Sequence, residues 1–270
     1  MAPEPDSTPI GVFDSGVGGL SVFKAIRQRL PSQPVIYLAD QAHVPYGHRS
    51  LEEVRWFAQQ ITQYLLDQGA GLIVVACNTA SAAALHSLRK VFHQVPFVGM
   101  EPAVKPAAEQ TRSGVVGVLA TQATFQGELY ASVVERFASG VTVLQATCPG
   151  LVDAIEGGDL DGSRPRAILE AALLPMLEKG IDTVVLGCTH YPFVIPLIQE
   201  ITGPEVRVID PAPAIARQTE RLLQAHGLLA PSGAPGWVRF LTSGEPEALA
   251  WLLPVRSEER RVGKECRSRW

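Results

Sequence analysis

Short apolar runs alternate along the chain with longer segments in which apolar residues recur every three or four positions. The short runs are four or five residues long and rich in Val, Ile and Leu, which is typical of buried strands. They lie at residues 10–13, 35–38, 72–76, 97–100, 115–119, 183–186 and 206–209. Strands that alternate with helical segments usually build a parallel sheet with helices on its faces. The pattern therefore predicts an α/β protein with mostly parallel sheets.

Two of the helical segments have recognisable ends. The first begins at Ser50, because Ser50 and Glu53 form a capping-box sequence, and it ends at Gly69. Its apolar face consists of Val54, Phe57, Ile61, Tyr64 and Leu65. The second begins near Ser163 and runs to Gly180. A predicted strand follows each helix at once, as in a β-α-β unit.

Two stretches of the chain match each other in form. GAGLIVVACNT, which ends at Thr79, and GIDTVVLGCTH, which ends at His190, each contain a glycine, an apolar strand, a cysteine and a polar pair. Cys77 and Cys188 therefore occupy equivalent places. Upstream, IGVFDS and VGVLAT match in the same way. The pattern predicts two related, pseudo-symmetric halves, although β-α units also resemble one another without a repeat.

Each of these two cysteines follows the carboxyl end of a predicted parallel strand, where open α/β sheets bind ligands. We expect a helix to begin directly after Cys77 and after Cys188, and the positive end of its dipole to lower the pKa of the thiol. The alternative is that both are small buried packing residues, which is the commoner role of an unpaired cysteine. Their equivalent contexts favour a shared chemical role.

Two equivalent thiols that face each other across a cleft suit one reaction in particular. One thiol can remove a proton from a carbon while the other delivers a proton to the opposite face, which is racemisation. Each sulfur must then be poised between thiol and thiolate, so acidic and basic neighbours are expected. Asp14 and His190 are candidates for that work.

Composition narrows the class of protein. With 46% hydrophobic and 19% charged residues, the chain has enough apolar material for a folded core. Its 23 basic and 27 acidic side chains give a net charge of −4, which argues against a general nucleic-acid binder. The final segment, RSEERRVGKECRSRW from Arg256, holds six of the basic residues and has no strand or helix period. We interpret residues 256–270 as a tail that is disordered or not native, attached to a body with a net charge of −7.

The cysteines and the start of the chain argue against further classes of protein. The chain contains four widely spaced cysteines: Cys77, Cys148, Cys188 and Cys266. They form no CxxC pair, which argues against a disulfide scaffold or a zinc site and predicts reduced thiols. We interpret Cys148 as structural and assign no metal role to His43 or His48. No secretion signal or apolar stretch of about 20 residues is visible, so we expect a soluble, cytoplasmic protein without a membrane segment.

Six motifs occur in the same order as in a known family. They are GVFDSGVGGLSV from Gly11, YLADQAHVPYG from Tyr37, VVACNTASA from Val74, GMEPAVKPA from Gly99, CPGLVDAIEGG from Cys148 and LGCTHYP from Leu186. Together they closely resemble the glutamate racemases of the aspartate/glutamate racemase superfamily. The resemblance runs from about residue 10 to residue 244. Ala120 departs from it, because many members have a glycine before the equivalent of Thr121.

The resemblance implies a cofactor-independent isomerase that interconverts L- and D-glutamate and supplies D-glutamate for peptidoglycan synthesis. It implies that neither pyridoxal phosphate nor a metal is needed. It further implies two α/β domains with the active site in the cleft between them, the first formed by residues 1–97 and 212–255 and the second by residues 98–211. Members usually form homodimers. No nucleic-acid or membrane partner is expected.

The resemblance also implies roles for individual residues. Cys77 would deprotonate D-glutamate and Cys188 would deprotonate L-glutamate, each returning a proton in the other direction. Asp14, His190 and Glu156 would assist the thiols. Substrate contacts would come from Asp14, Ser15, Tyr46, Gly47, Asn78, Thr79, Thr121, Thr189 and His190.

Other interpretations stay open from the residues alone. The DSGVGG sequence could be a tight turn between a strand and a helix, since it lacks the lysine and the glycine spacing of phosphate-binding loops. We expect backbone N–H groups at the helix starts after Asp14, Cys77 and Cys188 to hold the carboxylates of a substrate. The alternatives to a glutamate racemase are an aspartate or other amino-acid racemase of the same superfamily, and a non-catalytic amino-acid-binding protein.

Overall fold

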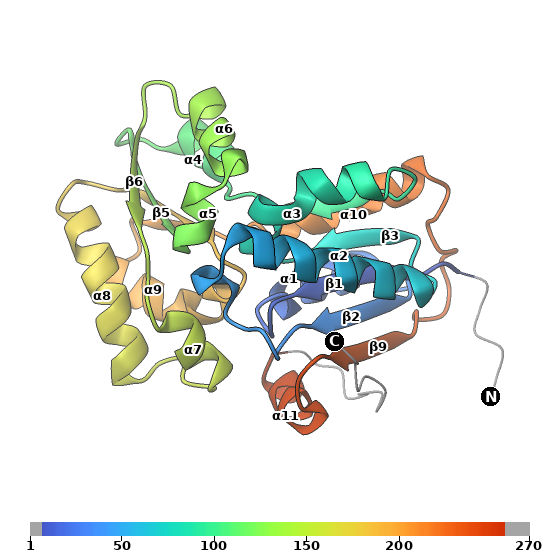
Figure 1. Ribbon diagram of the computed structural model, residues 1–270. Coiled ribbons are helices and arrows are strands. Elements are labelled where there is room, and N and C mark those ends of the chain that lie inside the picture. The colour runs from blue at the N-terminus through green and yellow to red at the C-terminus, as the bar shows by residue number, and fades with distance from the viewer. Residues whose placement is uncertain (1–6, 257–270) are drawn as a thin grey trace.

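A computed structural model describes residues 7–256 and contains two parallel sheets, each with helices on both faces (Figure 1). The predicted α/β class and mostly parallel sheets are confirmed. The predicted tail begins at Arg256, which is the last residue of the final helix, and otherwise lies outside the described residues. Among the described residues, no helix is long and apolar enough to cross a membrane.

The first sheet has five parallel strands in the order β4-β3-β1-β2-β9. The strands are β1 (Ile10–Asp14), β2 (Val35–Ala39), β3 (Leu72–Val75), β4 (Phe97–Gly99) and β9 (Val238–Thr242). One face is covered by α1 (Leu20–Arg29), α10 (Ala212–Ala225) and α11 (Pro246–Arg256), and the other by α2 (Leu51–Asp67) and α3 (Asn78–Val91). A short 3-10 turn, η1 (Tyr46–His48), lies in the connection from β2 to α2.

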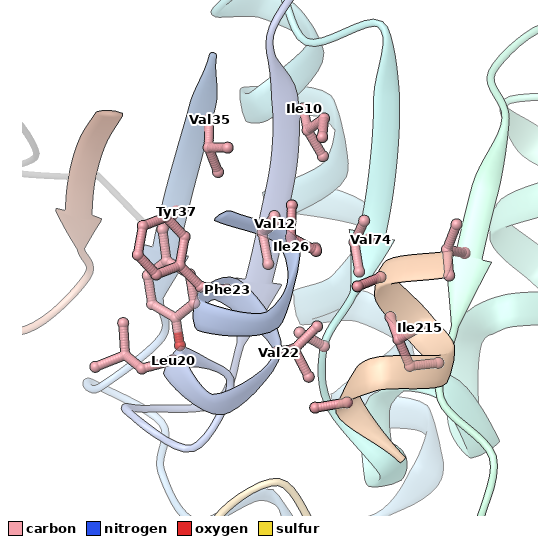
Figure 2. Close-up of a cluster of buried hydrophobic side chains, with 14 of the residues drawn as sticks. Ile10, Val12, Leu20, Val22, Phe23, Ile26, Val35, Tyr37, Val74 and Ile215 are labelled. Carbon is pink, nitrogen blue, oxygen red and sulfur yellow. The ribbon is translucent and has the colours of Figure 1, made fainter. Parts of the chain in front are cut away.

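Alternate residues of β1, β2 and β3 point to the face that α1 and α10 cover. Figure 2 shows Val12, Tyr37 and Val74 packed against Phe23 of α1 and Ile215 of α10, and all five side chains are buried. The ring centroids of Phe23 and Tyr37 lie 6.1 Å apart in an edge-to-face arrangement. This packing fixes α1 against the sheet, and it thereby fixes the turn that leads from β1 into α1.

The second sheet has four parallel strands in the order β6-β5-β7-β8. The strands are β5 (Val115–Ala120), β6 (Thr142–Ala146), β7 (Thr183–Gly187) and β8 (Arg207–Ile209). On one face lie α4 (Val104–Gln110), α5 (Gln122–Gln126) and α6 (Glu128–Phe137). On the other lie α7 (Leu151–Glu156), α8 (Ser163–Leu177), η2 (Tyr191–Val194) and α9 (Ile195–Thr202).

The strand orders of the two sheets confirm the predicted repeat. Four strands of the first sheet lie in the order β4-β3-β1-β2, and the second sheet, taken from its other edge, has the order β8-β7-β5-β6. In this alignment β1 corresponds to β5, and β3 corresponds to β7. Cys77 follows β3 and Cys188 follows β7. β9 is an addition to the first sheet without a counterpart in the second.

All seven predicted strands are present, with ends that differ from the predicted ends by at most one residue. The capping box is also present, since Ser50 Oγ accepts from the Glu53 N–H at 3.2 Å and Glu53 Oε2 accepts from the Ser50 N–H at 3.0 Å. The second predicted helix, α8, begins at Ser163 but ends at Leu177, three residues before Gly180. Two strands, β6 and β9, were not predicted.

The chain crosses between the sheets twice. It leaves the first sheet after β4, which pairs with β3, so the predicted crossing between residues 97 and 98 falls inside a strand of the first sheet. It returns after β8, and α10 then packs on α1.

Candidate active site

The carboxyl ends of strands from both sheets meet at one cavity of about 300 Å³. Ser15 and Cys77 reach it from the ends of β1 and β3, and Thr121 and Cys188 reach it from the ends of β5 and β7. Ten of the predicted site residues line it: Ser15, Tyr46, Gly47, Cys77, Asn78, Thr79, Thr121, Cys188, Thr189 and His190. The other two, Asp14 and Glu156, contact these lining residues without lining the cavity themselves.

Cys77 is the N-cap of α3 and is only 5% exposed. Its sulfur accepts hydrogen bonds from the Ala80 N–H at 3.4 Å and from the Ser15 N–H. Burial raises the pKa of the Cys77 thiol well above its ordinary value, and the nearby charge of Asp14 raises it further, although both N–H groups oppose the shift. The predicted lowering of this pKa by the helix dipole is therefore wrong, because lost hydration outweighs the helix N-terminus. In the ligand-free protein Cys77 is a neutral thiol.

Cys188 has different surroundings. Its sulfur lies 3.8 Å from His190 Nδ1, and the other ring nitrogen, Nε2, lies 2.6 Å from Glu156 Oε1. Burial alone would lower the pKa of His190, but hydrogen bonds with Cys188 and Glu156 and the charge of Glu156 raise it well above its ordinary value. His190 is therefore a buried cation between a sulfur and a carboxylate. The helix expected directly after Cys188 is absent, because η2 comes first and α9 begins seven residues after the cysteine.

The two carboxylates of the site each bridge the two halves of the chain. Glu156, at the end of α7, accepts from the Val17 N–H at 2.8 Å and is also hydrogen-bonded to the Gln41 side chain. Burial alone would raise the pKa of Glu156, but hydrogen bonding and the charge of His190 lower it below its ordinary value. Asp14 Oδ1 accepts from the Thr189 hydroxyl at 3.1 Å. Burial raises the pKa of Asp14, although the positive charge of His190 opposes this.

The glycines of DSGVGG let the turn after β1 approach the second half closely. A Cβ atom on Gly16 would overlap Glu156 Oε1, and a Cβ atom on Gly18 would lie 2.5 Å from His190 Nδ1. The Gly16 carbonyl accepts a hydrogen bond from the Tyr37 hydroxyl at 2.9 Å, which fixes the turn to β2. The glycines are therefore needed for packing around a carboxylate and an imidazole.

Asn78 and Thr79 form the first turn of α3 and line the cavity. The Asn78 side chain is buried, yet neither of its amide atoms has a hydrogen-bond partner among the described residues. Buried polar groups are normally paired, so this amide is available to a ligand. Thr79 Oγ1 lies 2.9 Å from Thr121 Oγ1, which lies 2.9 Å from Thr124 Oγ1. These hydroxyls connect the first half to the second beside the cavity.

The sequence predicted N–H groups free to bind a substrate at the helix starts after Asp14, Cys77 and Cys188. The structure agrees with this only after Cys77. The first N–H groups of α3 have no acceptor within the helix, as expected. After Asp14, however, the N–H groups of Gly16 and Val17 donate to Asp14 and Glu156 inside the protein. Cys188 is followed by η2, not by an α-helix. No Lys or Arg is among the described residues that line the cavity.

Further residues line the cavity that the sequence did not assign to it. Cys148, interpreted from the sequence as structural, is buried and forms part of the wall, and burial raises the pKa of its thiol to about 12. Val152 and Asp153 line the wall from α7. Their signal in the sequence is the CPG turn, in which Gly150 has a φ of 83° and starts α7 at the carboxyl end of β6. In the described part of the chain, no group of three or more His, Cys, Asp or Glu residues could hold a metal ion.

The chain has relatives and structural neighbours over almost its whole length. The model of the Asp/Glu/hydantoin racemase family matches residues 10–219. A glutamate racemase from Pseudomonas paraeruginosa is 53% identical over 260 residues, which cover 96% of this chain and 98% of that protein. The crystal structure of a glutamate racemase from Bacillus anthracis has a TM-score of 0.87 at 32% identity, covering 96% of this chain and 98% of the other. That of the Francisella tularensis glutamate racemase in complex with D-glutamate has a TM-score of 0.83 at 30% identity, covering 97% and 98%.

Proposed function

This chain belongs to the Asp/Glu/hydantoin racemase family, and we propose that it is a glutamate racemase, an isomerase that interconverts L-glutamate and D-glutamate. The identity with glutamate racemases over nearly the whole chain favours glutamate over aspartate as the substrate. The Francisella relative, which was solved with D-glutamate, supports the same class of ligand.

The observation that carries this proposal is the presence of two buried thiols, from equivalent positions in the two halves, in the wall of one cavity. Cys77 and Cys188 are 5% and 6% exposed and both line the cavity. A single base could remove a proton and return it only to the same face of the carbon. Two thiols that come from different halves of the chain can act on both faces, which inversion of the α-carbon requires.

The two thiols have different surroundings, and this difference indicates which of them acts first as the base and which as the acid. The cationic ring of His190 lies 3.8 Å from the Cys188 sulfur, whereas Cys77 is held as a neutral thiol. In the direction that consumes L-glutamate, Cys188 acts as the thiolate base that takes the α-proton, and the Cys77 thiol gives its proton to the opposite face. The protein then holds D-glutamate, a Cys188 thiol and a Cys77 thiolate, which is the state that runs the reaction in reverse. Asp14 accepts a hydrogen bond from Thr189, and Glu156 holds His190, so both carboxylates position residues beside Cys188.

The anionic substrate is held by local donors, because lysine and arginine are absent from the described lining of the cavity. We assign its carboxylates to the Asn78 amide, to the first N–H groups of α3 and to hydroxyls of Ser15, Thr79, Thr121 and Thr189. Tyr46 and Gly47 complete the wall. Donors directed at the α-carboxylate would also stabilise the negative charge that develops there when the α-proton leaves.

We extend the proposal to the cell by resemblance to the family. The enzyme works without a cofactor, supplies D-glutamate for peptidoglycan and acts in the cytoplasm as a homodimer. The two domains are those implied by the resemblance, except that the first boundary, between residues 97 and 98, moves past Gly99, the last residue of β4.

The decisive experiment incubates the protein, without any added cofactor, with L-glutamate in D2O. Circular dichroism would follow loss of optical activity, and NMR would follow deuterium at the α-carbon. We expect both signals with L-glutamate and with D-glutamate, and little turnover of aspartate. Turnover of aspartate alone would favour another racemase of the superfamily, and binding without turnover would favour a non-catalytic amino-acid-binding protein.

A further inference from the structure

Asp40 is a buried carboxylate that the reaction outlined above does not use. It follows β2 directly and is 2% exposed. Its backbone N–H donates to the carbonyl of Asp14 at 2.9 Å, so it lies beside the end of β1. A carboxylate removed from water needs several donors, and the residues that supply them indicate what it organises.

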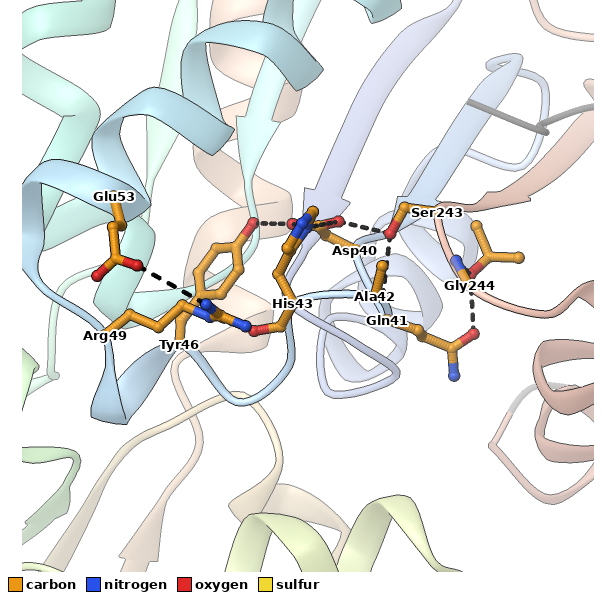
Figure 3. Close-up of polar contacts among 10 residues, drawn as sticks. Asp40, Gln41, Ala42, His43, Tyr46, Arg49, Glu53, Ser243 and Gly244 are labelled. Atoms are coloured by element: carbon orange, nitrogen blue, oxygen red, sulfur yellow. Dashed lines mark hydrogen bonds and ion pairs between the residues drawn. The ribbon is translucent and has the colours of Figure 1, made fainter. Parts of the chain in front are cut away.

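Three donors converge on the Asp40 side chain, as Figure 3 shows. The Tyr46 hydroxyl donates to Oδ2 at 2.5 Å, and the Ser243 hydroxyl donates to Oδ1 at 2.5 Å. His43 Nδ1 lies 2.9 Å from Oδ1 and 3.0 Å from Oδ2. These donors come from the loop between β2 and α2 and from the end of β9. Asp40 therefore joins a segment of the cavity wall to the last strand of the first sheet.

The end of β9 is itself fixed to this loop. The Ser243 N–H donates to the Ala39 carbonyl at 3.1 Å, and the Ser243 hydroxyl accepts from the Ala42 N–H at 3.1 Å. Thr242 donates its hydroxyl to Gln41 Oε1 at 2.9 Å. Ser243 is therefore held in place by hydrogen bonds other than the one it donates to Asp40, and it can anchor the Asp40 side chain.

The Tyr46 hydroxyl is committed to Asp40, while its ring lines the cavity and is 1% exposed. Burial and the charge of Asp40 raise the pKa of Tyr46 well above its ordinary value, so the hydroxyl remains a donor. The next residue, Gly47, also lines the cavity and lies against the second half, since a Cβ atom on it would be 3.1 Å from Thr121 Cβ. A shift of this turn would therefore change the wall on both sides.

We propose that Asp40, anchored by Ser243, is a positioning residue that fixes Tyr46 and Gly47 as the wall of the substrate cavity. This inference rests on the proposed function for its kinetic consequence, but its structural part holds for the ligand-free protein. Asp40 acts through Tyr46 and does not touch the reacting atoms.

The kinetic test compares Asp40→Asn with wild type. The amide cannot accept from all three donors, so the wall should loosen while both thiols keep their surroundings. We expect the KM for L-glutamate to rise about tenfold with kcat within about threefold of wild type. In a Tyr46→Phe background, Asp40→Asn should change KM by less than about twofold, because the shared interaction is already lost. An unchanged KM, or full additivity in the double variant, would overturn the proposal.

Asp182→Asn is the matched control. Like Asp40, Asp182 accepts several hydrogen bonds, from the Thr111 and Thr183 hydroxyls and the Arg112 and Ser113 N–H groups, but it precedes β7 at the end of the second sheet away from the cavity. Its loss should lower the melting temperature and leave KM unchanged. Ser243→Ala removes one donor and keeps the Asp40 carboxylate, so it should raise KM in the same direction by about threefold even if Asp40→Asn folds poorly.

Amide hydrogen exchange of the ligand-free proteins separates this inference from the proposed function. Asp40→Asn should speed exchange in residues 42–49 at least about tenfold relative to wild type, and Asp182→Asn should not. If wild type shows no racemase activity but the exchange result holds, the proposed function fails and the positioning role stands. If exchange in this segment is unchanged, the positioning role is wrong whatever the activity.

Discussion

Asn78 combines a disadvantage for folding with an advantage for binding. Its amide is buried without partners among the described residues, and such a group is less favourable than an apolar side chain of similar shape. It also lies in the cavity wall at the start of α3, where a carboxylate would supply the missing partners. The position therefore sacrifices stability in the free protein in order to bind the substrate.

We expect Asn78→Leu to raise the free energy of unfolding of the ligand-free protein by about 1 kcal/mol and to raise the KM for glutamate by about 30-fold or more. Thr62→Val is the matched control, because Thr62 Oγ1 on α2 is also buried and unpartnered in the described part of the chain but does not line the cavity. It should stabilise the protein without changing KM. Denaturant unfolding and steady-state kinetics measure both effects. A less stable Asn78→Leu, or one with normal KM, would contradict this account.

We expect the pair of Glu156 and His190 to set the alkaline limit of activity. A raised pKa keeps His190 charged as the pH rises through the ordinary titration range of histidine near about 6.5. In Glu156→Gln the burial remains while the negative partner is lost, so the pKa of His190 should fall. We expect the alkaline limb of kcat/KM to move to lower pH by at least about one unit. Rate profiles from about pH 6 to pH 10 test this, and coincident alkaline limbs would refute the role of Glu156.

Among the elements, the turn between β1 and α1 has the strictest requirements. It donates N–H groups to Asp14 and Glu156, and its glycines leave room for Glu156 and His190. The packing of Phe23 and Tyr37 holds the two elements that flank it. Its geometry is thus part of the site, even though most of its residues carry no reactive group.

Gly18→Ala should therefore displace the His190 ring and lower kcat by about 100-fold, because a shift of about 1 Å at a reacting group has effects of that size. Gly71→Ala is the control, because Gly71 directly precedes β3, lies outside the cavity lining, and would with a Cβ atom overlap Thr8 Cγ2. Both variants should lose some thermal stability, but only Gly18→Ala should lose activity. Equal kcat values in the two variants would show that the turn does not position His190.

The seven strands with mainly apolar sequences could be predicted from the sequence, whereas two partly exposed edge strands could not. The strands near Cys77 and Cys188 are continuous apolar runs and are fully buried. β6, with the sequence TVLQA, lies at an edge and is partly exposed, so Thr142 and Gln145 interrupt its apolar pattern. β9 is also an edge strand, with Arg239 near its start. The repeat itself would have indicated β6, which corresponds to β2.

For the whole molecule, the cavity exists because the carboxyl ends of two related sheets face one space. The repeat in the sequence was sufficient to select Cys77 and Cys188 out of four cysteines. It could not predict their unequal surroundings, because these depend on contacts between distant segments. Glu156 reaches His190 only where α7 meets the β1–α1 turn, and Asp40 reaches Tyr46 and Ser243 only where β9 joins the first sheet.

The most direct test of the two-thiol account follows the α-carbon in D2O with single-cysteine variants. Cys77→Ala should lose at least about 1000-fold of the racemisation rate, yet its Cys188 should still exchange the α-hydrogen of L-glutamate without inverting it. Cys188→Ala should lose as much and should exchange only D-glutamate. Far-ultraviolet circular dichroism should match wild type for both variants. Racemisation by either variant within about tenfold of the wild-type rate would contradict the assignment of one thiol to each face of the substrate.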